Sequence, residues 1–294
     1  MDYDINVLNT NVERNLENFT PDQQAIYDTV MTAVNEEKSL QLFISACDGC
    51  GKTYLLNGLL DAVCSSVQGG CIALATATTG IAADLLNLGR PFHSRFKVPI
   101  PIVEDSTLSI TAQSSLAKLV HRAKPIMIDE ASMFHRYALE ALEHTLHDLM
   151  NLLDTPFGGK IIVMAGDFTQ CIPVVPGYNI AQISNICINK FPLWRNFQTL
   201  SLTKNMRIRA GGNQRLEDFD KWTLSIGERE ANNNDEQVEI PEEHYFRINP
   251  NTVKNSKAEE NSMKEFCKLI FPNLARNIIL VMTIRIMTIM VTIK

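Results

Sequence analysis

The stretch LFISACDGCGKTYLLNGLLDAV, residues 42–63, decides the fold of this chain. A short apolar run leads into a loop of small residues, and a helix-like apolar segment follows from Thr53. The loop fits the phosphate-binding pattern G-x-x-x-x-G-K-[ST], except that Ala46 replaces the first glycine. Small residues let backbone N–H groups approach a polyphosphate, and the helix directs its N-terminus at the same anion. The stretch therefore predicts strand, phosphate loop and helix.

In such a loop each polar residue has a distinct role. Lys52 is predicted to place its charge on the β- and γ-phosphates of ATP, and Thr53 to give a hydroxyl to Mg²⁺. The loop backbone at 49–51, which comprises Gly49, Cys50 and Gly51, is predicted to hold the phosphates. The methyl group of Ala46 disfavours positive φ, so it either distorts the loop entry or is tolerated. The alternative is a chance Gly-Lys-Thr at a helix start.

Cys47 and Cys50 form a C-x-x-C pair within the same loop. This spacing also occurs at redox and zinc sites. A zinc site needs two more ligands at sensible spacing, and the sequence offers none. The phosphate-loop interpretation accounts for more residues and is preferred. A disulfide between the two cysteines is nevertheless expected to constrain the loop and weaken ATP binding.

A second apolar run, at 125–128, ends in Asp129 and Glu130. Acidic residues at the carboxyl end of a parallel strand lie where α/β sheets bind ligands. Asp129 is predicted to hold Mg²⁺ and Glu130 to orient and deprotonate the attacking water. The alternative is an acidic helix start. A third run, at 161–165, leads to Gln170, whose amide is predicted to sense the γ-phosphate; the alternative is a polar loop without a role.

Apolar strands alternate with helix-like segments along the first two hundred residues, which predicts an α/β fold with a parallel sheet covered on both faces. Strands are expected at 40–45, 71–77, 125–129, 160–165 and 197–202. Helices are expected at 22–34, 53–67, 80–88, 112–121, 132–153, 214–226 and 254–269. We predict a flexible or disordered segment at 1–18 and a P-loop α/β domain at 19–200. The incomplete start of a second unit is expected at 201–294, with an aberrant apolar tail from about 274.

Composition narrows the class of protein. A net charge of −6 argues against a wholly basic nucleic-acid-coating protein but allows a local basic groove. Seven scattered cysteines indicate reduced thiols. The acidic, polar N-terminus has no apolar signal core and no Arg-rich transit character. The reduced thiols favour an intracellular location, for which the nucleus is expected first, with the mitochondrion as the alternative. The run IILVMTIRIMTIMVTI at 278–293 is short for a membrane span and contains Arg285. A buried or aberrant strand-like end is preferred, a tail anchor is the alternative, and no membrane association is expected.

Taken in order, the motifs resemble the PIF-type and Helitron-type helicases of superfamily 1B. They are TPDQQ (20–24), the phosphate loop, ATATTGIAA (75–83), FHSRFK (92–97), DEAS (129–132), GDFTQ with IPV (166–174) and LTKNMR (202–207). Their order and spacing fit this family from about 19 to 230. The resemblance implies a RecA-like ATP-binding lobe at 19–200 and a truncated second helicase lobe at 201–294. The resemblance implies an ATP- and Mg²⁺-dependent DNA helicase of 5′-to-3′ polarity, acting in repair, recombination and telomere maintenance on single-stranded or tailed duplex DNA.

The resemblance also implies roles for individual residues. Gln23 matches the glutamine that reads adenine, and Arg207 the arginine that reaches the γ-phosphate from the second lobe. Thr78 and Thr79, together with the block containing His93 and Phe96, match motifs that contact single-stranded DNA. An aromatic ring beside cations suits base stacking with phosphate contact. The alternative for His93 and Phe96 is packing in the core.

Family motifs expected after Arg207 are not found: a Gln- and Gly-containing motif that couples to DNA, and a late motif with a second arginine. We therefore expect a C-terminally truncated form that does not unwind duplex DNA by itself. The rival hypothesis is a helicase remnant that binds ATP and single-stranded DNA without motor activity. A third interpretation is a general P-loop ATPase unconnected with DNA.

Overall fold

Six parallel strands form one sheet in the order β3-β2-β4-β5-β1-β6. The computed structural model describes residues 4–66, 72–170, 172–206 and 214–227. The strands are β1 (Leu40–Ala46), β2 (Ile72–Ala77), β3 (Arg90–Pro91), β4 (Ala123–Asp129), β5 (Ile161–Gly166) and β6 (Gln198–Leu202). The sheet confirms the predicted α/β class, and the five predicted strands lie within one or two residues of their expected positions; β3 was not predicted.

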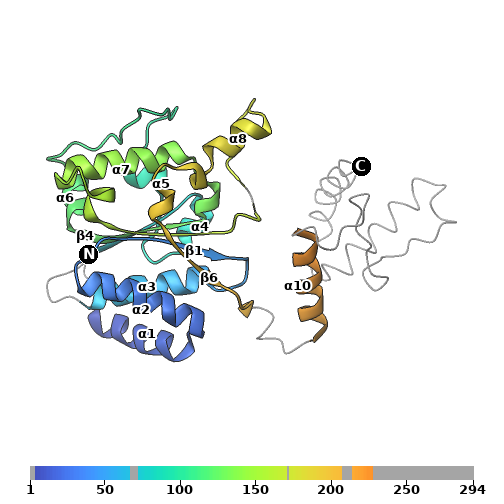
Figure 1. Cartoon of the computed structure of the whole chain (residues 1–294). Helices are drawn as coiled ribbons and strands as arrows, with labels where there is room; N and C mark the ends of the chain where they lie inside the picture. Colours follow the sequence, from blue (N-terminus) through green and yellow to red (C-terminus); the bar gives the residue numbers. More distant parts are fainter. Residues whose placement is uncertain (1–3, 67–71, 171, 207–213, 228–294) are drawn as a thin grey trace, which may run out of the picture. The chain divides into compact units, whose positions relative to one another are not determined.

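Helices cover both faces of the sheet (Figure 1). On one face lie α1 (Ile5–Asn18), α2 (Pro21–Asn35) and α3 (Lys52–Ser65), and on the other α5 (Phe92–Phe96), α6 (Ser115–Arg122) and α7 (Arg136–Met150). The shorter elements are α4 (Gly80–Asp84), α8 (Ile180–Ile186), η1 (Ala131–Met133), η2 (Pro156–Gly159), η3 (Ile188–Lys190) and η4 (Trp194–Asn196). The predicted helix at 254–269 lies outside the described residues.

The strands β1, β2, β4 and β5 each contribute to two hydrophobic cores because alternate side chains point to opposite faces. In β1, Leu42 and Ile44 pack against the α2–α3 side, whereas Phe43 packs against the α5–α7 side. All of these side chains are essentially inaccessible to solvent. Burial on both faces explains why the parallel strands appear in the sequence as continuous apolar runs.

The prediction of a flexible or disordered segment at 1–18 is wrong for the residues that the structure describes. They form α1, whose N-terminus is capped by the Asp4 carboxylate, which accepts a hydrogen bond of 3.0 Å from Asn6 N. The helix packs on α3, where Gly58 leaves room: a Cβ there would lie 2.7 Å from the ring of Phe19 and 3.3 Å from the amide of Asn15. The segment was not predicted as a helix because its residues are mostly polar.

The first compact unit extends to Asp218, beyond the predicted boundary at residue 200. The second unit begins at Phe219, within α10 (Gln214–Gly227), which overlaps the helix predicted at 214–226. The apolar tail from about 274 lies outside the described residues. Among the helices that the structure describes, none combines the length and apolar character needed to cross a bilayer.

Candidate nucleotide-binding site

The sheet order brings three motif-bearing loops to one edge. β5 lies between β1 and β4, so the segment after β5 sits between the phosphate loop, which follows β1, and the acidic pair, which ends β4. After β1 the chain passes through α3 and continues in β2, which is separated from β1 in the sheet by β5 and β4. Ligands bind at the carboxyl ends of parallel strands where the strand order switches in this way.

The phosphate loop has the backbone conformation that its glycines allow. Gly49 and Gly51 have φ values of +82° and +80°, in a region of backbone conformation that residues with a Cβ rarely adopt. Ala46 ends β1, pairs with Leu202 of β6 and does not have a positive φ. Its methyl group is buried in the core beneath the loop. The departure from glycine at this position is therefore tolerated without backbone strain.

Lys52 is folded into its own loop. Its ammonium donates hydrogen bonds of 2.8 Å to the carbonyl oxygen of Ala46 and 3.4 Å to that of Cys47, and the side chain is buried. A phosphate group would replace these carbonyls as the acceptor. The ammonium thus already lies within the loop that is predicted to hold the phosphates.

Thr53 and Asp129 meet directly, although 76 positions separate them in the sequence. The Thr53 hydroxyl donates to Oδ2 of Asp129 at 3.2 Å, and the other carboxylate oxygen accepts from Glu130 N at 2.8 Å. Desolvation raises the pKa of Asp129, against the opposing effects of these hydrogen bonds and the Lys52 charge. A hydroxyl beside one carboxylate suits Mg²⁺, which takes few protein ligands and keeps water and phosphate oxygens. In the described part of the chain, no cluster of three or more His, Cys, Asp or Glu side chains is placed to hold a metal.

Glu130 is held in a strained position at the end of β4. Its φ of +53° is left-handed, which is uncommon for a residue with a Cβ and occurs at functional sites. Its Oε2 is buried without a hydrogen-bond partner among the described residues. Desolvation and then the Asp129 charge raise the pKa of this carboxyl. A carboxylate with an unused acceptor and a raised pKa suits a general base.

The turn after Glu130 touches the end of β5. A Cβ placed on Gly166 would lie 2.8 Å from Ser132 N and 3.3 Å from Ala131 N, so only glycine fits. The next residue, Asp167, is buried and accepts hydrogen bonds from Thr169 N at 2.9 Å and from the Thr169 hydroxyl at 2.6 Å. Gln170 follows in the same turn, at the predicted edge of the sheet. Its contact with the γ-phosphate stays a prediction.

In this structure the Gln23 side chain contacts its own helix and the phosphate loop, and its role in reading adenine stays a prediction. Its oxygen accepts a hydrogen bond of 2.9 Å from Thr20 N, completing the capping box of α2. Its amide nitrogen lies 3.5 Å from the carbonyl oxygens of both Cys50 and Gly51, and the side chain is 1% exposed. Gln23 therefore links the start of α2 to the phosphate loop.

The segment after β6 contacts the phosphate loop and the start of α2. Met206 N donates to the carbonyl oxygen of Gly49 at 2.9 Å. Thr203 donates to Asp22 through its hydroxyl at 2.7 Å and its backbone N–H at 3.2 Å, and these hydrogen bonds lower the pKa of Asp22. Arg207, the predicted arginine finger, lies outside the described residues. Its neighbour Met206 shows that the chain reaches the site at this point.

These residues surround a cavity of about 450 Å³, a volume within the range of small-ligand sites. It is lined by Asp48, Gly49, Gly51, Lys52, Thr53, Tyr54, Leu85, Glu130 and Met206. Lys52 and Thr53 thus face the same cavity as Glu130, as predicted. Asp48, Tyr54, Leu85 and Met206 were not predicted as lining residues. Three of them had a signal in the sequence: Asp48 lies within the phosphate loop, Tyr54 directly follows the loop threonine, and Met206 belongs to the motif at 202–207.

The residues predicted to contact DNA divide into two groups. Thr79 and His93 are exposed, next to the paired ends of β2 and β3. Thr78 is half-buried, and its hydroxyl donates to the Glu130 carbonyl oxygen at 2.8 Å, so it links β2 to the acidic turn. The assignment of Phe96 is wrong: its ring is fully buried and packs 4.7 Å from that of Phe92. The apolar spacing of α5 directs both phenylalanines into the core.

Comparison with known proteins agrees with this geometry. The model of the PIF1-like helicase family matches residues 18–237. The chain belongs to this family. It is 33% identical over 136 residues to the ATP-dependent DNA helicase Pif1 of a Psychrobacter strain, covering 45% of this chain and 20% of that protein. It is 28% identical over 175 residues to the yeast (Saccharomyces cerevisiae) ATP-dependent DNA helicase RRM3, covering 58% of this chain and 24% of that protein.

Solved PIF1-like structures share the fold. The structure of Bacteroides Pif1 bound to single-stranded DNA superposes with a TM-score of 0.56 and 26% identity, over 71% of this chain and 46% of that one. A structure of Pif1 helicases at forked double-stranded DNA gives a TM-score of 0.52 with 26% identity, over 63% and 44% of the two chains. The chain spans about a fifth of the length of the first curated relatives it matches.

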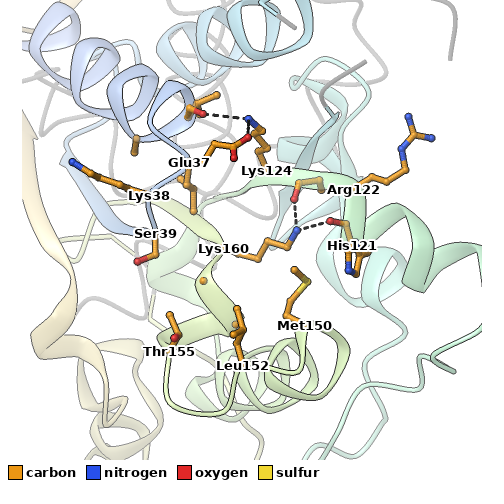
Figure 2. A pocket seen from close by; sticks show the side chains of 16 residues that line it. Glu37, Lys38, Ser39, His121, Arg122, Lys124, Met150, Leu152, Thr155 and Lys160 are labelled. Atoms are coloured by element: carbon orange, nitrogen blue, oxygen red, sulfur yellow. Dashed lines mark hydrogen bonds and ion pairs between the residues drawn. The ribbon is translucent and has the colours of Figure 1, made fainter. Parts of the chain in front are cut away.

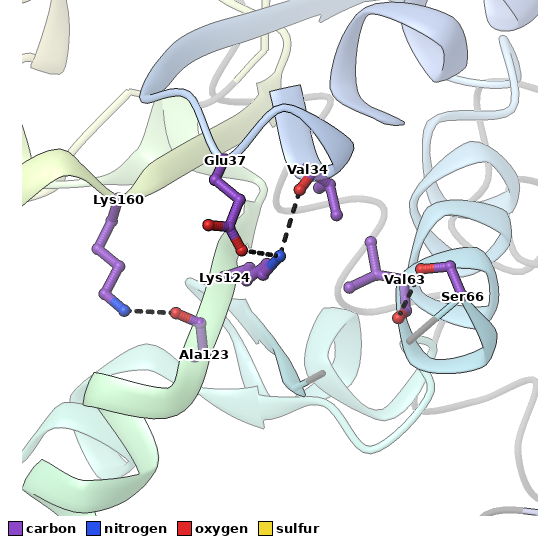
Figure 3. Close-up of polar contacts among 7 residues, drawn as sticks. All are labelled: Val34, Glu37, Val63, Ser66, Ala123, Lys124 and Lys160. Atoms are coloured by element: carbon purple, nitrogen blue, oxygen red, sulfur yellow. Dashed lines mark hydrogen bonds and ion pairs between the residues drawn. The ribbon is translucent and has the colours of Figure 1, made fainter. Parts of the chain in front are cut away.

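A second, larger cavity of about 640 Å³ lies at the amino edge of the sheet, and several basic side chains line it (Figure 2). Two lysines there bind the ends of helices (Figure 3). Lys124 donates to Val34 O of α2 at 3.3 Å and to Glu37 at 2.9 Å. Lys160 donates to His121 O of α6 at 2.7 Å and to Ala123 O. Both neutralise the negative ends of helix dipoles, a structural role.

Proposed function

We propose that this PIF1-like chain binds ATP with Mg²⁺ at the carboxyl edge of β1, β5 and β4 and hydrolyses it as part of a DNA helicase. The contact between Thr53 and Asp129 carries the proposal, because it brings together, from two separate motifs, the two groups expected to hold Mg²⁺. Lys52 would take the phosphates, and Mg²⁺, when bound between Thr53 and Asp129, would neutralise charge on the phosphate oxygens. Glu130 would accept the proton of the attacking water.

Single-stranded DNA is the proposed partner. Thr79 and His93 are exposed at the carboxyl edge near β2 and β3, and Arg90 and Lys97 lie exposed close to them in the sequence. Cations and an imidazole ring at one edge suit contacts with phosphates and bases. The relatives' names and their DNA-bound structures support this partner. We further propose 5′-to-3′ polarity, a role in repair, recombination or telomere maintenance, and a nuclear or mitochondrial location, on the family resemblance.

The test measures ATP hydrolysis by residues 1–294 with Mg²⁺, with and without single-stranded DNA. We expect hydrolysis that DNA stimulates and that Glu130→Gln abolishes while nucleotide binding persists. Hydrolysis by Glu130→Gln at the parental rate would refute the site assignment. Hydrolysis that DNA leaves unchanged would favour a P-loop ATPase unconnected with DNA.

A strand-displacement assay on a duplex with a 5′ single-stranded tail separates the remaining possibilities. Displacement that is lost in Lys52→Ala would identify the chain as a working motor. ATP and DNA binding without displacement would identify a non-motor helicase remnant.

A further inference from the structure

We propose that Cys47 and Cys50 form a thiol-disulfide modification site that switches off nucleotide binding. Both are thiols in this structure, and both lie within the loop that is predicted to hold the phosphates. The inference rests on the proposed nucleotide binding and adds a form of regulation to the same site.

The turn between the two cysteines brings them within reach of a disulfide. Cys50 N donates to the Cys47 carbonyl oxygen at 3.4 Å, and Gly49, at the third position of the turn, has a φ of +82°. These are the features of a type II β-turn, in which the first and last Cα atoms lie less than about 7 Å apart. Disulfides join Cα atoms roughly 4.4–6.8 Å apart.

Their side chains share the same surroundings. Cys50 is buried in the core beneath the loop, and Cys47 is half-buried and packs against the same cluster. Only the two residues Asp48 and Gly49 separate them, and the glycine gives the turn the freedom to tighten. The partial exposure of Cys47 makes it the cysteine that a small disulfide in solution reaches first.

The chemistry is thiol-disulfide exchange with a low-molecular-weight disulfide of the glutathione type. The Cys47 thiolate attacks one sulfur of that disulfide, a mixed disulfide forms, and one thiol leaves. The Cys50 thiolate then attacks the Cys47 sulfur and releases the second thiol. The protein loses two electrons and two protons, and the small disulfide is reduced to two thiols. A thiol reductant reverses both steps.

The bond would oppose phosphate binding because it fixes a loop that has to change its contacts. In the reduced structure Lys52 is bound to the carbonyl oxygens of Ala46 and Cys47, and it must exchange them for phosphate oxygens. A disulfide at Cys47 holds that carbonyl in the turn and restricts the peptide groups that follow. Misalignment of one charge-assisted hydrogen bond is worth on the order of tenfold in affinity.

The experiment compares the affinity of residues 1–294 for a fluorescent ATP analogue with Mg²⁺ before and after glutathione disulfide treatment. Mass spectrometry of peptides confirms the Cys47–Cys50 bond. We expect affinity to fall about tenfold or more and to recover with reductant. In Cys47→Ser the ratio of reduced to treated affinity should be near one, whatever its starting affinity. The matched control Cys64→Ser, which removes a thiol of α3, should keep the full response.

Equal affinity of the reduced protein and of protein with the confirmed disulfide would overturn the inference and leave the proposed function intact. Failure of the Cys47–Cys50 disulfide to form, while the other thiols react, would also overturn it. A reduced protein without measurable nucleotide affinity would overturn the proposed function and this inference together.

Discussion

Replacing Gly166 by alanine should separate catalysis from nucleotide binding. The added Cβ would lie 2.8 Å from Ser132 N and 3.3 Å from Ala131 N, whereas ordinary contacts begin at 3.4 Å. Both neighbours are backbone atoms at the turn that follows Glu130, so no side chain can rotate away. The end of β5 and this turn must therefore separate by about 0.6 Å.

The clashing atoms belong to the turn after Glu130, so this displacement acts first on Glu130, whereas the phosphate loop follows the neighbouring strand β1. Misplacement of a catalytic group by about 1 Å costs on the order of 10²-fold in rate, so we expect kcat to fall roughly tenfold with nucleotide affinity little changed. Overpacking of this kind also costs about 1–3 kcal/mol of unfolding free energy. Steady-state ATP hydrolysis and denaturant unfolding measure the two effects.

Gly80→Ala is the matched control, since a Cβ there meets nothing within 4 Å and its φ is not positive. It should leave ATP hydrolysis without DNA at the parental level. If Gly166→Ala matched Gly80→Ala in both kcat and unfolding free energy, the contact between β5 and the turn would have no role in placing Glu130.

Three further predictions concern separate parts of the molecule. Lys52→Ala should lose nucleotide binding in calorimetric titration, because it removes the ammonium held in the loop. Asp22→Asn should lower Tm at pH 7; the difference should shrink as pH falls through the lowered pKa of Asp22, because protonation removes the same stabilisation. Phe96→Ala should lower the free energy of unfolding, measured with denaturant, by about 3–5 kcal/mol. His93→Ala should leave that free energy unchanged and weaken binding of single-stranded DNA, measured by fluorescence anisotropy, by about tenfold.

The sequence predicted what depends on local pattern. The strands appear as apolar runs because they are buried on both faces of the sheet. The motifs follow the carboxyl ends of these parallel strands, so the sheet geometry predicts that Thr53 and Asp129 lie close together. Residues whose position depends on tertiary packing were predicted less well. The motif around Phe96 contains cations and an aromatic ring, but α5 turns that ring into the core. α1 buries Leu8 and Asn15 and lies against the space left by Gly58, and one buried leucine in a mostly polar segment is too weak a pattern to predict a docked helix.

Part of the candidate site is already arranged for Mg²⁺ and phosphate, whereas other side chains of the site bind carbonyl groups of the phosphate loop. The Thr53 hydroxyl and the Asp129 carboxylate already meet, so a magnesium ion would find together the two protein groups proposed to hold it. Lys52 and Gln23, by contrast, bind carbonyl groups of the loop. A nucleotide phosphate would replace the carbonyls at Lys52, and part of the binding free energy would be used in that exchange. Met206 N donates a hydrogen bond to Gly49 O and so attaches the segment after β6 to the phosphate loop. A change in the loop backbone on ATP binding would therefore act directly on this segment.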